Sequence, residues 1–403
     1  MRSGALAIAG ALTAGPAILD AQRRVPLADR YSDLRRHFFF EYYPWYRTDP
    51  WEHWPEGGHH PPADLGSNFV PALGLYDSRS TAVMEQHARW IANAGVGAID
   101  VSWWGPDSNV NEIIPTLMDV MGAHDVHVAF YIEPYTDAHA QNYARDVLSL
   151  IKTYGDRRHW DYFLLHEYED GTVGPAFKSF RTILPATGTD CHGVTTPVGD
   201  YAADALWRRQ TDAVRETLKG DFDRVTLLAD SLAVDRTQAS GFDGIALFDN
   251  YVSIDRWRQA AADCSSRGLV FSFQINPGFD SIVFPQSDPN ACYKPPAFAP
   301  GGGTYDWTRV QDREAAAQAS RSRIVESFEA TVGLQTSPSL SDAKQGFFLA
   351  YINSFNEWHE GHQFEPAKDS RDLTDAERAA GYHDPENGRY RLDELRDLIR
   401  SIS

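Results

Sequence analysis

Residues 346–361 read GFFLAYINSFNEWHEG, an apolar run that ends abruptly in polar side chains. The run from Phe347 to Phe355 is β-rich, and Glu357 and Glu360 follow it at once, three positions apart. Inside a strand these two side chains would point to opposite faces of the sheet. Beyond the strand end, in a turn or a first helical turn, an i,i+3 pair converges on one side. The stretch therefore predicts a buried strand whose carboxyl end presents two carboxylates to one cleft.

Paired carboxylates among aromatic residues suit the cleavage of a glycosidic bond. One group protonates the leaving oxygen while the other works at the sugar. Asn356 directly precedes the pair and is a candidate for binding the sugar or for donating to Glu357. The alternative is a solvated helix start that carries two glutamates without a catalytic role.

The composition is that of a globular protein, with 42% hydrophobic and 23% charged residues among 403. This length fits one large α/β barrel or two ordinary domains. The formal net charge of -19 repels nucleic acids and anionic membranes, so we exclude both as partners. The 11 Trp and 18 Tyr suit stacking on sugar faces, although a large core would explain them too.

The N-terminus carries one arginine and then a mild apolar segment from Gly4 to Leu19. This pattern predicts a signal peptide or a disordered leader over residues 1–21, and hence a secreted, periplasmic or lumenal protein. No stretch is typical of a membrane span. The widely spaced Cys191, Cys264 and Cys292 allow at most one disulfide bond and do not form a metal-site pattern.

Short β-rich runs alternate with helical patterns along the chain. The eight predicted strands are Phe38–Tyr43, Val96–Trp103, Val126–Glu133, Asp161–Glu167, Arg224–Asp230, Gly244–Asp249, Leu269–Ile275 and Phe347–Phe355. The predicted helices are Thr81–Ala94, Val110–His124, Asn142–Tyr154, Asp204–Leu218, Ile254–Arg267, Arg309–Val332 and Leu392–Ile402.

Eight strand–helix units predict a single α/β domain over residues 30–403, a (β/α)8 TIM barrel whose long βα loops form the active-site cleft. A doubly wound sheet is the main rival, but no glycine-rich phosphate loop follows the first strand. We expect Phe177–Asp204 and the region around residues 300–303 to be long βα insertions.

Several predicted strands contain or end near an acid or an amide. In a barrel such ends meet around one cavity, although some of these groups are expected to be buried structural acids instead. The residues are Asp100, Glu133, Glu167, Asp230, Asp249, Asn276 and Glu357.

Short motifs in a fixed order link the chain to a known family. They are YYPWY (42–46), HW (53–54), DLGSNF (64–69), LGLY (73–76), VSWW (101–104), AFYIEPY (129–135), GFDG (241–244), SFNEWHEG (354–361) and EP (365–366). The ordered set resembles glycoside hydrolase family 99, the endo-α-1,2-mannosidases and endo-α-1,2-mannanases.

The resemblance implies a (β/α)8 barrel that cleaves inside a glycan at an α-mannosyl linkage, with retention and without metal or other cofactor. It implies that Glu357 removes the proton of the sugar 2-hydroxyl, giving a 1,2-anhydro sugar, and that Glu360 is the general acid/base. Glu133 matches a third carboxylate that holds the neighbouring sugar. On this basis we expect a raised pKa for Glu360 and an ionised Glu357.

Other side chains near these carboxylates are candidates for binding the oligosaccharide or polysaccharide substrate. Because strand residues alternate, only about half of them face the cavity, and the aromatic candidates fill the barrel in the other reading. The candidates are Tyr43, Tyr46, His53, Trp103, Tyr251 and Asn356.

The chain departs from the family pattern at residues 162–201, 247–251 and 276–280, which keeps another α-linked polysaccharide open as the substrate. A glycan-binding barrel without catalysis is a further alternative. The cluster His359-Glu360-Gly361-His362 resembles a metal-ligand motif, but its H-E-x-H spacing differs from the H-E-x-x-H that places two histidines on one helical face. We therefore predict no metal site.

Overall fold

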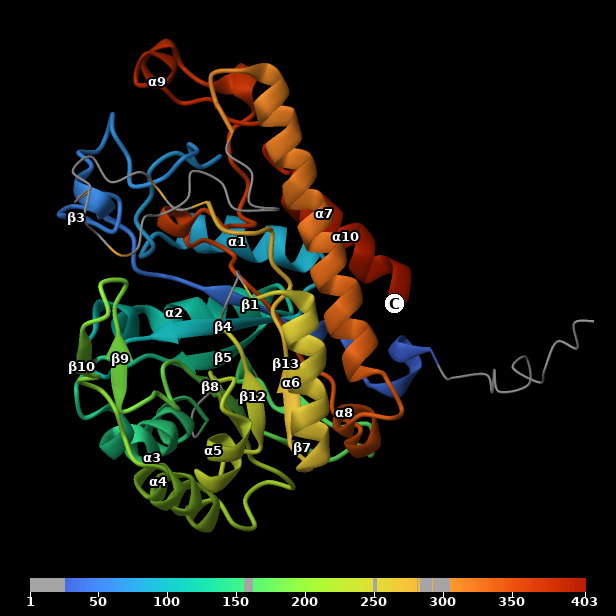
Figure 1. Ribbon diagram of the computed structural model, residues 1–403. Helices are drawn as coiled ribbons and strands as arrows, with labels where there is room; N and C mark the ends of the chain where they lie inside the picture. Colours follow the sequence, from blue (N-terminus) through green and yellow to red (C-terminus); the bar gives the residue numbers. More distant parts are fainter. Residues whose placement is uncertain (1–25, 156–161, 249–251, 281, 283–291, 293–304) are drawn as a thin grey trace, which may run out of the picture.

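The computed structural model describes residues 26–155, 162–248, 252–280, 282, 292 and 305–403 (Figure 1). Eight strands form one sheet in the order β13-β12-β11-β8-β5-β4-β1-β14. Every neighbouring pair in it is parallel. The strands are β1 (Phe38–Tyr42), β4 (Ala98–Trp103), β5 (His127–Ile132), β8 (Ala176–Ser179), β11 (Thr226–Ala229), β12 (Gly244–Ala246), β13 (Val270–Ser272) and β14 (Ala350–Ile352).

The two outer strands of this order, β13 and β14, meet just beyond their ends. The backbone N–H of Ile275 donates to the carbonyl of Tyr351 at 2.9 Å, and the N–H of Asn353 donates to the carbonyl of Ile275 at 3.0 Å. Ile275 and Ile352 thereby form a parallel bridge that joins the edges of the sheet. The predicted (β/α)8 barrel is confirmed.

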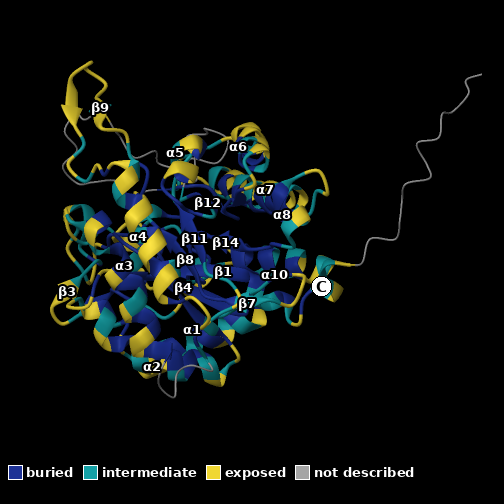
Figure 2. Cartoon of the chain, turned by 90° about the horizontal axis from the view of Figure 1, so that it is seen from below, coloured by how far each residue is buried: buried dark blue, intermediate teal, exposed yellow. Residues whose placement is uncertain are grey.

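Helices surround the barrel, with their outer faces exposed and the strands buried inside (Figure 2). The seven predicted helices are all present within a few residues of the expected bounds, and the short α5, α8 and α9 are additions. The helices are α1 (Thr81–Asn93), α2 (Asn109–Ala123), α3 (His139–Leu150), α4 (Asp204–Thr217), α5 (Val234–Ala239), α6 (Ile254–Ser266), α7 (Val310–Gln335), α8 (Ser341–Gln345), α9 (Asp375–Ala379) and α10 (Tyr390–Ile402).

The predicted fourth strand, Asp161–Glu167, is wrong over its described residues, 162–167; Asp161 lies outside them. Phe163 makes only an isolated bridge to β5, and His166–Glu167 (β6) pairs instead with Val173–Gly174 (β7) in a small antiparallel hairpin. The carboxylate of Glu167 accepts a bond from Ser32 at 2.6 Å, before β1 and therefore at the amino end of the barrel. The strand that lies between β5 and β11 is β8, most of which falls within the predicted insertion Phe177–Asp204. The insertion proper begins after Ser179.

Alternation along β1 separates two layers of the core. Phe38 and Phe40 belong to the large cluster that packs between barrel and helices, whereas Phe39 belongs to a second cluster inside the barrel. Glu41 faces the same way as Phe39, so a carboxylate lies inside the barrel.

A buried ion pair compensates that carboxylate. The Nζ of Lys178, on β8, donates to Glu41, and the Gln274 side chain donates to the same oxygen at 2.7 Å. The ammonium also lies 4.4 Å from the ring centroid of Tyr131 and 4.7 Å from that of Tyr351. Burial raises the pKa of Glu41, and the Lys178 charge and hydrogen bond oppose that rise.

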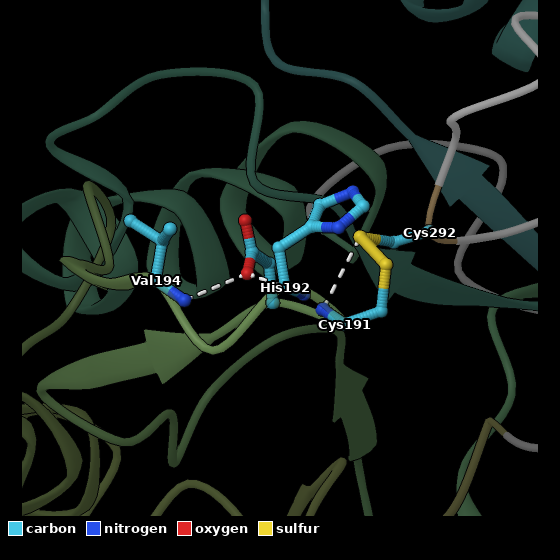
Figure 3. The surroundings of a disulfide bond; sticks show 5 residues. Cys191, His192, Val194 and Cys292 are labelled. Carbon is cyan, nitrogen blue, oxygen red and sulfur yellow. Dashed lines mark hydrogen bonds between the residues drawn. A yellow bond between two sulfur atoms is a disulfide. The ribbon is translucent and has the colours of Figure 1, made fainter.

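A disulfide bond ties two long βα loops together (Figure 3). The β8–α4 loop carries an exposed hairpin of β9 (Thr187–Thr189) and β10 (Thr195–Pro197). Cys191, at the tip of this hairpin, is bonded to Cys292 in the β13–α7 loop with an S–S distance of 2.06 Å. Cys264 is free and buried. This pairing is the one bridge that three cysteines permit.

No helix among the described residues is long and apolar enough to cross a membrane. Residues 1–21, predicted as a leader, lie outside the described residues.

Candidate active site

The loop after β14 carries both predicted catalytic carboxylates. Glu357 precedes a single 3-10 turn, Trp358–Glu360, which ends at Gly361. Gly361 has a φ of 73°, and a Cβ atom there would lie 1.9 Å from the carbonyl oxygen of Asp280. Only glycine fits this position, because it tolerates a left-handed backbone and lacks the clashing atom. The tight turn brings His362 back beneath the two glutamates.

A buried network anchors this loop from behind. The Trp358 indole donates to Glu365 at 2.9 Å, and the same carboxylate oxygen accepts from the Tyr76 hydroxyl at 2.7 Å. The backbone N–H of Trp358 donates to the hydroxyl of Tyr46 at 2.9 Å. His87 contacts the other Glu365 oxygen at 3.1 Å. These bonds hold the turn from its core side and fix the backbone that carries Glu357 and Glu360.

His362 joins the two carboxylates. Its Nε2 lies 2.8 Å from Glu360 Oε2 and 3.2 Å from Glu357 Oε2, and its Nδ1 lies 2.9 Å from the hydroxyl of Ser354. The same hydroxyl accepts the backbone N–H of Glu357 at 2.8 Å. His362 is fully buried and Glu357 is nearly so, while the side chain of Glu360 keeps 29% of its surface exposed. Glu360 is thus the carboxylate of this pair that opens most to solvent.

The charge states of the three groups depend on one another. Burial and the neighbouring Glu360 raise the pKa of Glu357 to about 7. Burial alone would lower the pKa of His362, but contacts with both glutamates outweigh it and raise that pKa to about 9. Burial also acts to raise the pKa of Glu360, yet the His362 hydrogen bond and the charges of His362 and His359 hold it below its usual range.

The expected order of the two glutamate pKa values is therefore reversed in the free protein. Burial and like charge alone would raise the pKa of Glu360 above that of Glu357. The imidazole of His362 lies against the Glu360 carboxylate, and this cation favours its ionised form.

Glu133 lies at the carboxyl end of β5, as predicted, and is buried. Its carboxylate accepts a bond of 2.7 Å from the hydroxyl of Ser102, which in turn accepts the indole N–H of Trp104 at 2.9 Å. Burial raises the pKa of Glu133 well above its ordinary value, and the charge of Glu357 adds to the rise. The mutual effect places Glu133 within electrostatic reach of the catalytic pair.

Three of the predicted binding residues are buried and bond to other parts of the protein. Tyr46 is 0% exposed and supports the turn through Trp358. Asn356 is also fully buried, where its amide exchanges bonds of 2.8 and 3.0 Å with the backbone of Tyr43. Trp103 points outward, because Ser102 takes the inward position on β4, and its indole donates to Asn111 at 2.9 Å.

An aromatic cavity of about 240 Å³ is lined by Trp45, Trp104 and one predicted residue, His53, among others. The imidazole of His53 stacks on Trp45 with ring centroids 4.2 Å apart, and Trp45 lies 5.6 Å from His359. Trp104, 37% exposed, forms another wall of this cavity. Trp104 is thus the aromatic residue of the VSWW motif that reaches the surface.

Two further predicted residues complete the set. Tyr43 is buried with its ring 4.7 Å from that of Trp45, and after burial itself the charges of Glu357 and Glu41 contribute most to raising its pKa. Tyr251 lies outside the described residues.

The family model described as "Glycosyl hydrolase family 99" matches residues 35–167. The glycoprotein endo-alpha-1,2-mannosidase of Mus musculus is 26% identical, over 89% of this chain and 74% of the relative. The glycoprotein endo-alpha-1,2-mannosidase-like protein of Homo sapiens is 28% identical, over 84% of this chain and 69% of the relative. The GH99 endo-alpha-mannosidase from Bacteroides thetaiotaomicron superposes with a TM-score of 0.63 and 19% identity, covering 91% of this chain and 97% of that one.

The chain is a glycoside hydrolase related to family 99. The family model ends near the β6 hairpin, whereas the pairwise alignments extend over most of the chain. The likeness to the solved structure agrees with the barrel found above.

Among the residues that the structure describes, two groups of side chains have the residue types of metal sites. Cys191, His192 and Cys292 lie together, but the disulfide removes both thiolates. Glu357, His359 and Glu360 place their ligand atoms within 4.8 Å of one another. There, however, the Nε2 of His362 already contacts both carboxylates, and its raised pKa supplies the positive charge that an ion would bring. The absence of a catalytic metal stays a prediction.

Proposed function

We propose that this glycoside hydrolase cleaves internal α-1,2-linked mannosidic bonds with retention of anomeric configuration. The curated relatives that carry the name endo-alpha-1,2-mannosidase support the substrate class. The observation that carries the proposal is the close approach of Glu357 and Glu360, whose carboxylate oxygens lie within 4.8 Å of each other. Retaining enzymes keep their two carboxyl groups about 5–5.5 Å apart, and inverting enzymes separate them by about 6.5–9.5 Å.

In the proposed mechanism Glu357 is the base. Its carboxylate takes the proton of the sugar 2-hydroxyl, whose oxygen then attacks C1 to give a 1,2-anhydro sugar. The pKa of about 7 matches this task, because a base is most useful when it is ionised near the working pH yet still holds a proton well. The buried position excludes water from the carboxylate while the sugar is bound.

Glu360 is the proposed general acid/base. It is the more exposed of the two carboxylates, so it can reach the glycosidic oxygen that leaves toward solvent. It first protonates that oxygen and later takes a proton from the water that opens the anhydro sugar. In the free protein Glu360 is ionised, so a proton must reach it before the first step.

Glu133 and the aromatic cavity are proposed to hold the neighbouring sugars. A carboxyl group with a raised pKa, fixed by Ser102, can both accept from and donate to sugar hydroxyls. Trp45, Trp104 and His53 offer ring faces on which sugars stack. Because Ser102 links Glu133 to Trp104, the two subsites share one support.

Product analysis on an α-1,2-linked manno-oligosaccharide tests the proposal. We expect the wild type to release internal fragments and Glu360→Gln to lose activity while it still binds the glycan. Glu167→Gln is the matched control, since the carboxylate of Glu167 accepts bonds from the backbone N–H and the hydroxyl of Ser32 at the opposite end of the barrel. Unaltered turnover by Glu360→Gln would remove that residue from its role.

A second candidate substrate is another α-linked polysaccharide. The β8–α4 loop, with its exposed hairpin, is joined by a disulfide to the β13–α7 loop. It lies in one of the three regions where the sequence departs from the family pattern. Long βα loops shape the subsites of a barrel enzyme. If well-folded wild type cleaves no mannan, a panel of α-glucans and mixed α-glycans is the next measurement, with Glu360→Gln as the blank.

We further propose that residues 30–403 form one catalytic domain that works in an oxidising compartment, such as the periplasm, the secretory lumen or the cell exterior. The Cys191–Cys292 disulfide supports the compartment, because such bonds persist outside the reducing cytosol. Mass analysis of the protein from its native host, with and without reductant, shows whether the bond is formed and where the mature chain begins.

A further inference from the structure

His362 has no role in the mechanism so far, although it is fully buried and contacts both catalytic carboxylates. Its Nε2 is hydrogen-bonded to Glu360 at 2.8 Å, and Glu357 Oε2 lies 3.2 Å from the same nitrogen. A ring that only filled space would not need this nitrogen beside both residues that must exchange protons with the substrate.

We propose that His362 is the proton store of the catalytic pair, a positioning residue that holds in the free enzyme the proton that Glu360 later gives to the leaving oxygen. The inference rests on the proposed function, because it assigns the acid role to Glu360. It gives the source of the proton that must reach the ionised Glu360 before the first step.

The other side of the imidazole is built for both charge states. Ser354 lies 2.9 Å from Nδ1, and its oxygen also accepts the backbone N–H of Glu357 at 2.8 Å. When Nε2 gives its proton to Glu360, Nδ1 keeps its hydrogen, and the serine hydroxyl accepts the Nδ1–H bond from the charged and from the neutral ring. His362 can therefore gain or lose its Nε2 proton while Nδ1 stays paired.

The remaining surroundings favour the charged ring. The loop that carries His362 also carries the carboxylates of Glu357 and Glu360. It carries His359 as well, whose pKa is lowered by burial. Phe248 and Phe279 approach from the β12 end and the β13–α7 loop, with ring centroids at 6.2 and 5.9 Å. Below it lies Glu41, already paired with Lys178, and Glu133 acts on Glu357 from β5. The two contacting glutamates are thus the groups that set its charge.

The proton count closes over both steps. The three groups share one proton beyond a neutral imidazole and two carboxylates. It leaves His362 Nε2 for Glu360, then passes to the leaving oxygen as the C1–O bond breaks, while Glu357 takes the 2-hydroxyl proton and C1–O2 forms. In the second step Glu360 takes a proton from water, the hydroxide oxygen bonds to C1, C1–O2 breaks and O2 takes the proton from Glu357. The proton on Glu360 then returns to His362.

The dependence of kcat/KM on pH tests whether His362 stores the proton. In the wild type we expect the basic limb of kcat/KM near pH 9, where His362 loses its proton. In His362→Gln the amide still donates to Glu360 but carries no exchangeable proton of this kind, so the basic limb moves to lower pH and activity at pH 7 falls roughly 10²–10³-fold. A limb that stays in place in this variant would overturn the inference.

A glycosyl fluoride separates proton supply from positioning, because fluoride leaves without a proton. His362→Gln is expected to cleave the α-mannosyl fluoride substrate at nearly the wild-type rate while losing the sugar leaving group. An equal loss on both substrates would mean that the ring only shapes the site. His124→Gln is the matched control, since His124 lies 2.7 Å from Glu85 on the surface, away from the cleft.

Titration of the ring by ¹⁵N NMR of histidine-labelled enzyme needs no substrate. We expect the His362 resonance, assigned from its absence in His362→Gln, to stay in the imidazolium form to about pH 9 and to titrate lower in Glu360→Gln. Titration near the ordinary value of about 6.5 would overturn the proton store whatever glycan is cleaved. An imidazolium at pH 8 in an enzyme that cleaves no mannan would instead overturn the proposed substrate.

Discussion

Buried histidines lie at both ends of β14, and their charge states are opposite. At the carboxyl end, His362 lies between two glutamates and its pKa rises to about 9. At the amino end, His37 and His166 both donate to the carbonyl of Phe348, at 2.8 and 2.9 Å. Burial lowers the pKa of His37 to about 4 and that of His166 to about 3.

The difference teaches that burial alone does not decide what a histidine does. Desolvation opposes the charged ring at both ends by a similar route. A neutral carbonyl cannot offset that cost, so His37 and His166 remain neutral and fix the packing before β1 and β14. Two carboxylates offset it, and His362 keeps a proton that can move. The amino end of the barrel is therefore suited to stability and the carboxyl end to chemistry.

Removing a carboxylate from the carboxyl end should have the largest effect. Glu357→Gln is expected to lower kcat/KM by roughly 10²–10⁴-fold, because the 2-hydroxyl loses its base. It should also lower the pKa of His362, which loses one of its two anionic partners. Steady-state kinetics and the histidine NMR titration measure the two effects. A full loss of activity with no change in the His362 titration would break the link between the base and the ring.

Lys178, a buried cation inside the barrel, can be compared with His362. Its charge is fixed by the ion pair with Glu41. Lys178→Met leaves a buried carboxylate without its cation and should cost about 3–5 kcal/mol of unfolding free energy. The double variant Glu41→Leu with Lys178→Met should recover much of that loss, since neither charge remains. Urea denaturation at pH 7 gives both values. Equal costs for the single and the double variant would show that the ammonium acts by packing only.

The neutral histidines at the amino end predict acid sensitivity. The folded pKa of His37, about 4, is below the unfolded value of about 6.5, so the unfolded chain binds more protons between these limits. Stability from His37 is fully present above pH 6.5 and is lost as pH falls toward 4, by roughly 2 kcal/mol between pH 7 and pH 5. His37→Gln should flatten that part of the stability curve. Urea midpoints at the two pH values measure it, and an unchanged slope in the variant would contradict the assignment.

The smallest effect concerns the aromatic cavity. Trp104→Ala removes a ring face worth about 0.5–1.5 kcal/mol, so KM should rise roughly three- to tenfold with kcat nearly unchanged. Trp51→Ala is the matched control, because Trp51 is exposed to the same 37% but does not line the cavity. Similar KM changes in both variants would show that the cavity is not a sugar subsite.

Hydrophobic pattern was enough for seven of the eight strands, because long β-rich runs such as Val126–Glu133 stand out between helices. The fourth strand escaped prediction because β8 is only four residues long and carries Lys178 and Ser179. A lysine inside a barrel is recognisable only once its partner Glu41 is known to lie opposite. That pairing joins residues 137 positions apart and leaves no local signal.

In the active site, too, local sequence patterns were predictable and contacts between side chains were not. The positions of Glu357, Glu360 and Glu133 at strand ends were predictable from the motifs, but which face of β4 points inward was not, so Trp103 was chosen where Trp104 reaches the cavity. The charge order of the pair also failed, because the turn at Gly361 returns His362 onto both carboxylates. His362 is only two positions from Glu360, but the sequence alone does not show that the turn brings their side chains into contact.

The most direct test of the central claim is the anomeric configuration of the first product, followed by ¹H NMR as the wild type cleaves an α-1,2-linked manno-oligosaccharide. The close carboxylate pair predicts that the new reducing end appears first as the α anomer, with the β anomer growing in later by mutarotation. A β anomer that appears first would mean direct attack by water, and would contradict the roles given to Glu357, Glu360 and His362.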